Sequence, residues 1–148
     1  MIQAGGSVRV IEAGFIAAPA GGSAIEERLR AIHDSVCEII ERLKPDAMAV
    51  EQLYSHYAHP RTAILMGHAR GVIFLAASKN SVPVVSYSAT QVKKSLTGNG
   101  HAGKEQMQRM VKNVLGLAAL PSPSDVADAL AVALCHANHS DKGLRIKD

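Results

Sequence analysis

The sequence predicts an α/β domain in which a partly parallel sheet is flanked by helices. Short segments with strand character alternate with longer segments whose apolar residues recur at helical spacing. The segment Asp46–Val50 is almost entirely apolar, as is typical of strands covered on both faces in α/β proteins. A chain of 148 residues, 47% of them hydrophobic, suits one domain with its own core, which we expect to span residues 1–140.

Three strands and two long helices are predicted in the first half of the chain. In order, they are a strand over Val8–Ile16, a helix over Ile25–Leu43, a strand over Asp46–Val50, a helix over Arg61–Lys79 and a strand over Val82–Tyr87. Lys44-Pro45 ends the first helix, because proline has no backbone N–H and disfavours a helical residue before it.

The second half is predicted to be helical. It holds a short helix capped by Ser88 and ending near Leu96, a helix over Gly103–Leu117, and a last helix from Asp125 to about Asn138. Residues 141–148 form a polar, basic tail that we expect to be loose.

The charge of the chain permits a polyanionic partner without demonstrating one. The formal net charge is +3, and the basic residues gather between positions 91 and 113, where they are opposed only by Glu105. Such a run is also typical of a solvated helix face. The longest uncharged apolar stretch, Val72–Ser78, is too short to span a bilayer, so we expect a cytoplasmic protein without a membrane partner.

Three acidic residues stand where ligands collect in α/β proteins. Glu51 follows a predicted strand directly, and Asp125 and Asp128 share one face of the last helix. If they converge, they form an oxygen-only site suited to Mg²⁺ or Mn²⁺, which can hold two ions for phosphodiester hydrolysis. The other interpretation is local, because acids at strand ends are common and acids in a first helical turn stabilise the helix dipole.

Two further features of the sequence suggest contacts with other molecules. Tyr54 lies just beyond Glu51, where an aromatic ring can stack on an unpaired base or pack against the domain itself. The helix over Arg61–Lys79 is apolar over more than one face and carries Gly67 and Gly71 four residues apart. A symmetric homodimer is the simplest partner for that face, and a helix sandwiched within one domain is the alternative.

Four stretches resemble one family in order and spacing: KPDAMAVEQLY, GHARGVIFLAA, SYSATQVKKSLTGNGHAGKEQM and DVADALAVALCH. The family is RuvC, the bacterial Holliday-junction resolvase, whose fold is RNase H-like with a mixed sheet flanked by helices. The resemblance covers nearly the whole chain. It implies a homodimeric, Mg²⁺-dependent endodeoxyribonuclease that cleaves four-way junction DNA and works with a branch-migration helicase. A related nuclease acting on RNA is a more distant alternative.

The resemblance also assigns roles to residues of this chain. It implies that Glu51, Asp125 and Asp128 are three of four metal-binding carboxylates, and that Tyr54 stacks at the opened centre of the junction. It puts Lys93 and Lys104 near the scissile phosphate. Gly67 and Gly71 fall in the helix that forms the dimer.

The beginning of the chain departs from the family pattern. Family members start with a strand ending in Asp-Pro-Gly, whose aspartate is the first metal ligand, whereas Met1-Ile2-Gln3 aligns inside the second strand. No aspartate occurs here before Asp34. We expect that this sequence starts late, by a misassigned start codon or by fragmentation, and that the intact protein cleaves junctions. The alternative is a protein that binds four-way junctions but is impaired in catalysis.

Overall fold

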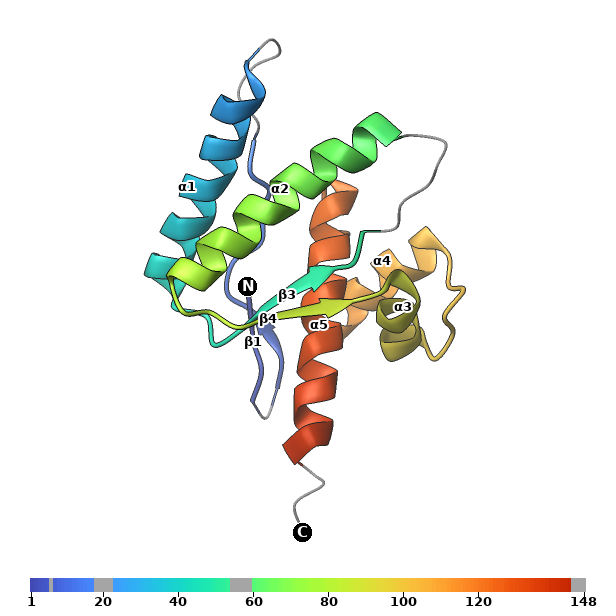
Figure 1. Cartoon of the computed structure of the whole chain (residues 1–148). Helices are drawn as coiled ribbons and strands as arrows, with labels where there is room; N and C mark the ends of the chain where they lie inside the picture. Colours follow the sequence, from blue (N-terminus) through green and yellow to red (C-terminus); the bar gives the residue numbers. More distant parts are fainter. Residues whose placement is uncertain (6, 18–22, 54–59, 145–148) are drawn as a thin grey trace. The chain divides into compact units, whose positions relative to one another are not determined.

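The computed structural model describes residues 1–5, 7–17, 23–53 and 60–144, with side chains described as far as residue 140 (Figure 1). The chain packs as two compact units. Unit 1 comprises Met1–Phe15, Ala49–Glu51 and Ser86–Asp148, and unit 2 comprises Ile16–Met48 and Gln52–Val85. The predicted α/β class with alternating strands and helices is confirmed.

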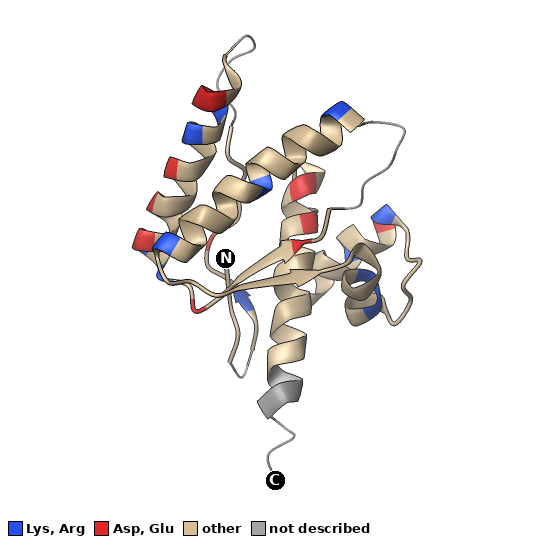
Figure 2. Ribbon diagram, viewed as in Figure 1, with Lys and Arg blue, Asp and Glu red and all other residues tan. Residues whose placement is uncertain are grey.

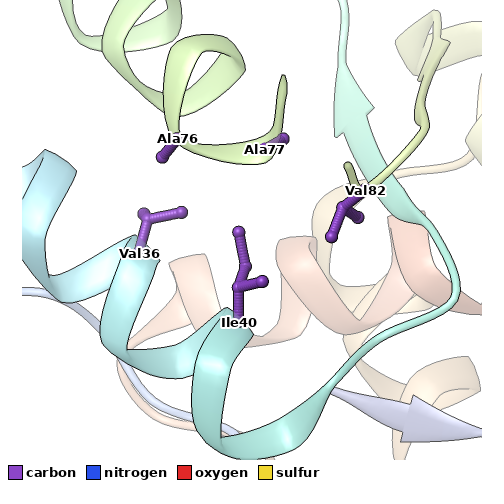
Figure 3. Close-up of a cluster of buried hydrophobic side chains, with 5 residues drawn as sticks. All are labelled: Val36, Ile40, Ala76, Ala77 and Val82. Atoms are coloured by element: carbon purple, nitrogen blue, oxygen red, sulfur yellow. The ribbon is translucent and has the colours of Figure 1, made fainter. Parts of the chain in front are cut away.

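Two long helices build unit 2. Helix α1 (Ile25–Leu43) has the predicted bounds, and α2 (Pro60–Lys79) begins one residue earlier than predicted. The two helices pack on each other around a core of buried side chains (Figure 3), which are Val36, Ile40, Ala76, Ala77 and Val82. The two alanines are fully buried, and their small side chains let the helix backbones come close.

Strands β3 (Met48–Glu51) and β4 (Val84–Tyr87) pair with each other and run in the same direction (Figure 1). Helix α2 makes the crossover that a parallel pair requires. The prediction that the first of these strands is covered on both faces is wrong, because Met48–Val50 are only half-buried. The described sheet has two strands here, so β3 does not have the neighbours that would enclose it.

Three helices make the body of unit 1. They are α3 (Ala89–Thr97), α4 (Lys104–Val114) and α5 (Ser124–Leu144), and they pack on one another in every pair. The predicted Ser88 cap is confirmed as a full capping box with Gln91. Helix α4 ends earlier than the predicted Leu117, because Gly116 adopts a left-handed φ of 61°. Helix α5 runs past the predicted Asn138, into the segment expected to be loose.

The predicted strand over Val8–Ile16 is mostly wrong. Strand β2 covers only Arg9–Val10 and pairs antiparallel with β1 (Ile2–Gln3), in the register Ile2 to Val10 and Gln3 to Arg9. A strand persists only where its backbone groups find partners, and β1 supplies two residues of ladder. Among the described helices, none combines the length and the apolar character needed to cross a membrane.

Candidate active site

Glu51 ends β3 at the carboxyl edge of the parallel pair. The apolar residues Met48, Ala49 and Val50 are half-buried and hold the strand in place, while Glu51 is exposed. The carboxyl edge of parallel strands is where α/β proteins gather polar ligand-binding groups. The local sequence therefore places the Glu51 carboxylate at the edge of the sheet where ligand-binding groups are expected.

The first turns of α5 deliver two more carboxylates to unit 1. Val126 and Ala127 are buried against the unit, which turns Asp125 and Asp128 outward, and both aspartates are exposed. Acidic segments lie at the end of β3 and in the first turns of α5, and basic segments lie on α3 (Figure 2). All of these elements belong to unit 1.

Electrostatics join Glu51 to two of its predicted neighbours. Burial raises the pKa of the Glu51 carboxyl above its ordinary value, the charge of Asp128 raises this pKa further, and the ammonium group of Lys93 lowers it. Burial is the largest of these causes, and the charges of Asp128 and Lys93 act on the same carboxyl in opposite directions. Glu51, Asp128 and Lys93, which we call the acid pair and its lysine, therefore form one interacting group.

Asp125 has a polar contact of its own at the start of α5. Its carboxylate accepts a hydrogen bond from the Ser124 hydroxyl at 3.5 Å, and the residue stands at the exposed start of α5. Across the part of the chain that the structure describes, no three His, Cys, Asp or Glu side chains are grouped closely enough to hold a metal ion. The predicted convergence of the three carboxylates stays a prediction, and the raised pKa of Glu51 links this residue electrostatically to Asp128.

The other predicted site residues have mixed outcomes. Lys104 is the first residue of α4 and is exposed, and Gly67 and Gly71 are exposed on α2 of unit 2. Tyr54, with its predicted stacking role, lies outside the described residues.

Pattern reasoning missed one residue of unit 1 that matters to the site. Tyr87, the last residue of β4, is buried and hydrogen-bonded to His136 of α5, at 2.9 Å between the hydroxyl oxygen and Nδ1. The available signal was its place at the carboxyl end of the strand that pairs with β3. Nothing in the sequence pairs it with a histidine 49 positions later.

The acid pair offers what a hard divalent cation binds. Carboxylate oxygens are the protein ligands that Mg²⁺ and Mn²⁺ prefer, and Mg²⁺ is commonly held by one or two carboxylates together with water and substrate phosphate. The like charges of Glu51 and Asp128 are unfavourable by themselves, and a cation between them removes that repulsion. The chemistry of the two carboxylates therefore fits a divalent metal.

An α/β fold with acidic residues at the carboxyl edge of its parallel strands has an arrangement suited to metal binding, and the RNase H-like class that the sequence resembles has such a fold. Comparison with known proteins identifies one family within the RNase H-like class. The sequence model of the family described as crossover junction endodeoxyribonuclease RuvC matches residues 1–136. The chain belongs to this RuvC family.

Individual relatives agree with the family match. The crossover junction endodeoxyribonuclease RuvC of Rhodopirellula baltica is 57% identical over 111 residues, which cover 75% of this chain and 62% of that protein. The RuvC of Moorella thermoacetica is 46% identical over 143 residues, covering 97% of this chain and 84% of the relative. The chain thus spans just under two thirds of the first relative and more of the second.

Solved structures confirm the fold. The Thermus thermophilus RuvC structure matches with a TM-score of 0.86 and 37% identity, covering 97% of this chain and 86% of that one. T. thermophilus RuvC in complex with Holliday junction substrate matches with a TM-score of 0.89 and 36% identity, covering 96% and 86%. The RNase H-like architecture predicted from the resemblance is therefore established.

Proposed function

We propose that this protein resolves Holliday junctions by hydrolysing DNA phosphodiester bonds at the acid pair, with Mg²⁺ as its metal. The observation that carries the proposal is the match to the RuvC family over residues 1–136, which includes Glu51 at the end of β3 and Asp128 at the start of α5. The raised pKa of Glu51, to which Asp128 and Lys93 contribute with opposite signs, supports it. Two carboxylates and a cation meeting at a strand end are the parts that such a reaction requires.

Each member of the site has a role that follows from its chemistry. Glu51 and Asp128 would hold the metal, and Asp125, one turn earlier on α5, would complete the set when the cation draws the carboxylates together. Bound divalent ions, two per site in the proposed enzyme, supply charge stabilisation for the attacking and leaving oxygens, and Mn²⁺ is a substitute of the same class. Lys93 would contact the phosphate being cleaved.

The proposed DNA surface continues onto α4. An open depression of about 550 Å³ runs along this helix and includes Lys104, Gln106, Arg109 and Asn113 in its lining. Cations and amide donors are the groups that contact phosphate and sugar oxygens without reading sequence. A four-way junction is a partner selected by shape, so contacts of this kind suit it. The stacking role of Tyr54 stays a prediction.

We also propose that the protein works as a homodimer through α2. Ile64, Leu65, Met66 and Leu75 of this helix are exposed by 58%, 43%, 51% and 52%. A Cβ atom added at Gly67 or Gly71 would meet nothing within 4 Å, so this face is open to another backbone. Two symmetric nicks require two active sites, which a twofold dimer supplies. The cytoplasm as the place of action, and a branch-migration helicase as a further partner, follow only from the family resemblance.

The test of the activity is cleavage of a synthetic four-way junction. The chain is incubated with labelled junction in Mg²⁺, in Mn²⁺ and in EDTA, with linear duplex of the same sequence as competitor. We expect paired symmetric nicks that depend on the metal, and salt-sensitive binding that prefers the junction. Metal-dependent cleavage of duplex and junction at equal rates would contradict the proposal, and binding without nicking would leave a junction-binding protein only.

Three isosteric variants test whether the three acidic residues act as metal ligands. Glu51→Gln, Asp128→Asn and Asp125→Asn should each abolish cleavage while leaving junction binding in EDTA intact, because each removes a metal ligand and leaves the side-chain shape unchanged. Glu38→Gln, at an exposed position of α1 in unit 2, is the matched control and should cleave normally. Loss of binding in all three site variants would assign the acids to folding.

The dimer has its own test. Gly71→Leu raises helix propensity, and its Cβ would meet nothing within 4 Å, so we expect α2 to stay folded while the larger side chain blocks its open face. Sedimentation should then show a monomer, whereas the wild-type chain and a Gly14→Leu control remain dimeric. An unchanged dimer would place the interface elsewhere.

A further inference from the structure

The contact between Tyr87 and His136 is a buried polar link between the sheet and α5. Tyr87 is 6% exposed, and its hydroxyl oxygen is 2.9 Å from His136 Nδ1. The two rings meet edge to face with centroids 5.9 Å apart, and the His139 ring packs on the same tyrosine at 5.3 Å. Burying a hydroxyl is unfavourable unless it is hydrogen-bonded, so phenylalanine would fill the space but lose the link.

The position of Tyr87 in the chain gives this link a consequence for α3. Tyr87 immediately precedes Ser88, the N-cap residue whose side chain and that of Gln91 close the capping box. The first turn of α3 is therefore fixed to the residue that His136 holds. An anchor on Tyr87 is in effect an anchor on the beginning of α3.

Two more contacts hold α3 along α5. The Asn138 side-chain amide donates to the Ser95 hydroxyl at 3.2 Å, and the Cys135 thiol donates to the Gln91 carbonyl at 3.9 Å. With Tyr87, this makes three polar attachments on one stretch of α5, residues 135–138. Apolar packing alone lets a short helix slide or roll, whereas directional hydrogen bonds fix both its register and its rotation.

The attached helices are the ones that carry the site. Helix α3 carries Lys93, whose charge acts on Glu51, and α5 carries Asp128 eight residues before His136, about 12 Å along the helix axis. Asp128 is thus a residue of α5 itself. Lys93 is held to α5 indirectly, because the Tyr87 link fixes the beginning of α3. Loss of the Tyr87–His136 hydrogen bond would therefore move Lys93 relative to Glu51 and Asp128 without changing either acidic residue.

We propose that Tyr87 and His136 are positioning residues, whose hydrogen bond sets where Lys93 stands relative to Glu51 and Asp128. This inference rests on the proposed nuclease function for its effect on the reaction, but not for its effect on α3. Their role is exerted through α3, whose first turn follows Tyr87 directly.

The experiment is a double-mutant cycle of Tyr87→Phe and His136→Leu in the full chain. Three quantities are measured: the single-turnover rate of junction cleavage in Mg²⁺, the junction Kd in EDTA, and amide hydrogen exchange of α3. Val111→Ala is the control, because Val111 is fully buried in α4 and makes no side-chain hydrogen bond. It destabilises the same unit without cutting the link.

We expect Tyr87→Phe to slow cleavage by about 10–100-fold, as small misplacements of catalytic groups do, with the Kd unchanged. Exchange of α3 amides should rise about fivefold. His136→Leu should act alike, and the double variant should be no worse than either single one, because both remove the same bond. Val111→Ala should lower the Tm without a selective effect on α3.

Three results would overturn the inference. They are additive losses in the double variant, a cleavage loss no greater than that of Val111→Ala at equal loss of Tm, and a rise in Kd that accounts for the slower cleavage. If the wild-type chain binds junctions without cleaving them, the proposed function fails by itself. Amide hydrogen exchange then tests the Tyr87–His136 anchor by itself. A selective rise in the exchange of α3 amides supports the anchor, and no rise overturns it.

Discussion

Replacing Glu51 by glutamine should stabilise the metal-free protein, although it destroys the proposed active site. Burial and the charge of Asp128 both disfavour the Glu51 carboxylate in the folded state, and Lys93 offsets only part of this, since the net effect raises the pKa. Glutamine has nearly the same shape and no charge, so the repulsion disappears. The wild-type residue is thus expected to cost stability when no cation is bound.

The gain in stability of Glu51→Gln is limited because the site is exposed to solvent. Exposed charge pairs contribute about 0.2–1 kcal/mol after solvent screening. For a chain of 148 residues this corresponds to a rise in Tm of up to about 4 °C. Metal should reverse the order, because a cation at one hundred times its Kd stabilises the wild-type protein by about 2.7 kcal/mol and the variant much less.

The pH dependence has a definite sign. The pKa of Glu51 is higher in the folded state than its ordinary value of 4.5, so the penalty is fully present above the folded pKa. It shrinks as the pH falls through the folded pKa and is absent below about 4.5. The difference in Tm between Glu51→Gln and wild type should therefore be largest at neutral pH in EDTA and vanish in acid.

Thermal unfolding followed by circular dichroism, in EDTA and in Mg²⁺ at several pH values, measures all of this. Glu105→Gln is the matched control. Its carboxylate pairs with Arg109 at 3.6 Å, so the same substitution should leave stability unchanged or lower it slightly. A Glu51→Gln variant that is less stable than wild type in EDTA, or a difference that ignores pH, would refute the repulsion between the acids.

Other residues of unit 1 give further expectations. Lys93→Gln should slow cleavage because it removes the cation beside the acids, whereas Lys94→Gln, on the next and exposed position of α3, should not. Leu134→Ala should lower stability by about 2–5 kcal/mol in denaturant titrations, since Leu134 is 1% exposed at the centre of α5. Gly100→Ala should cost about 1–3 kcal/mol in the same assay, because the new Cβ would lie 2.8 Å from a neighbouring side chain, while Gly103→Ala meets nothing within 4 Å.

Helices were the predictable part of this fold because their signals are local. The bounds of α1 follow from apolar spacing and the Lys44-Pro45 stop, and the start of α3 follows from the capping box at Ser88. The strand predicted over Val8–Ile16 failed for the opposite reason. Its pattern specified which residues favour a strand, but the partner ladder lies elsewhere in the chain, and only Ile2 and Gln3 provide it.

The candidate site was predictable in part. Glu51, Asp125 and Asp128 were expected to converge because a strand end and a helix start carry them, and this convergence stays a prediction, although the charge of Asp128 acts on the Glu51 carboxyl. The position of the Asp125 carboxylate relative to Glu51 and Asp128 depends on side-chain torsions that no sequence pattern fixes. The Tyr87 link was invisible for a related reason, since a tyrosine at a strand end and a histidine in a helix have no spacing rule that joins them.

The balance of charge at the site also argues that metal and DNA bind cooperatively. Two carboxylates against one lysine leave a net negative charge at the end of β3, which repels a phosphate group. A divalent cation reverses that sign, and the phosphate in turn supplies oxygen ligands that two carboxylates leave open. Each partner therefore strengthens binding of the other by the same factor. In the proposed enzyme, Lys93 would keep some attraction for DNA when no metal is bound, so that a site built from acids could still bind a polyanion before cleaving it.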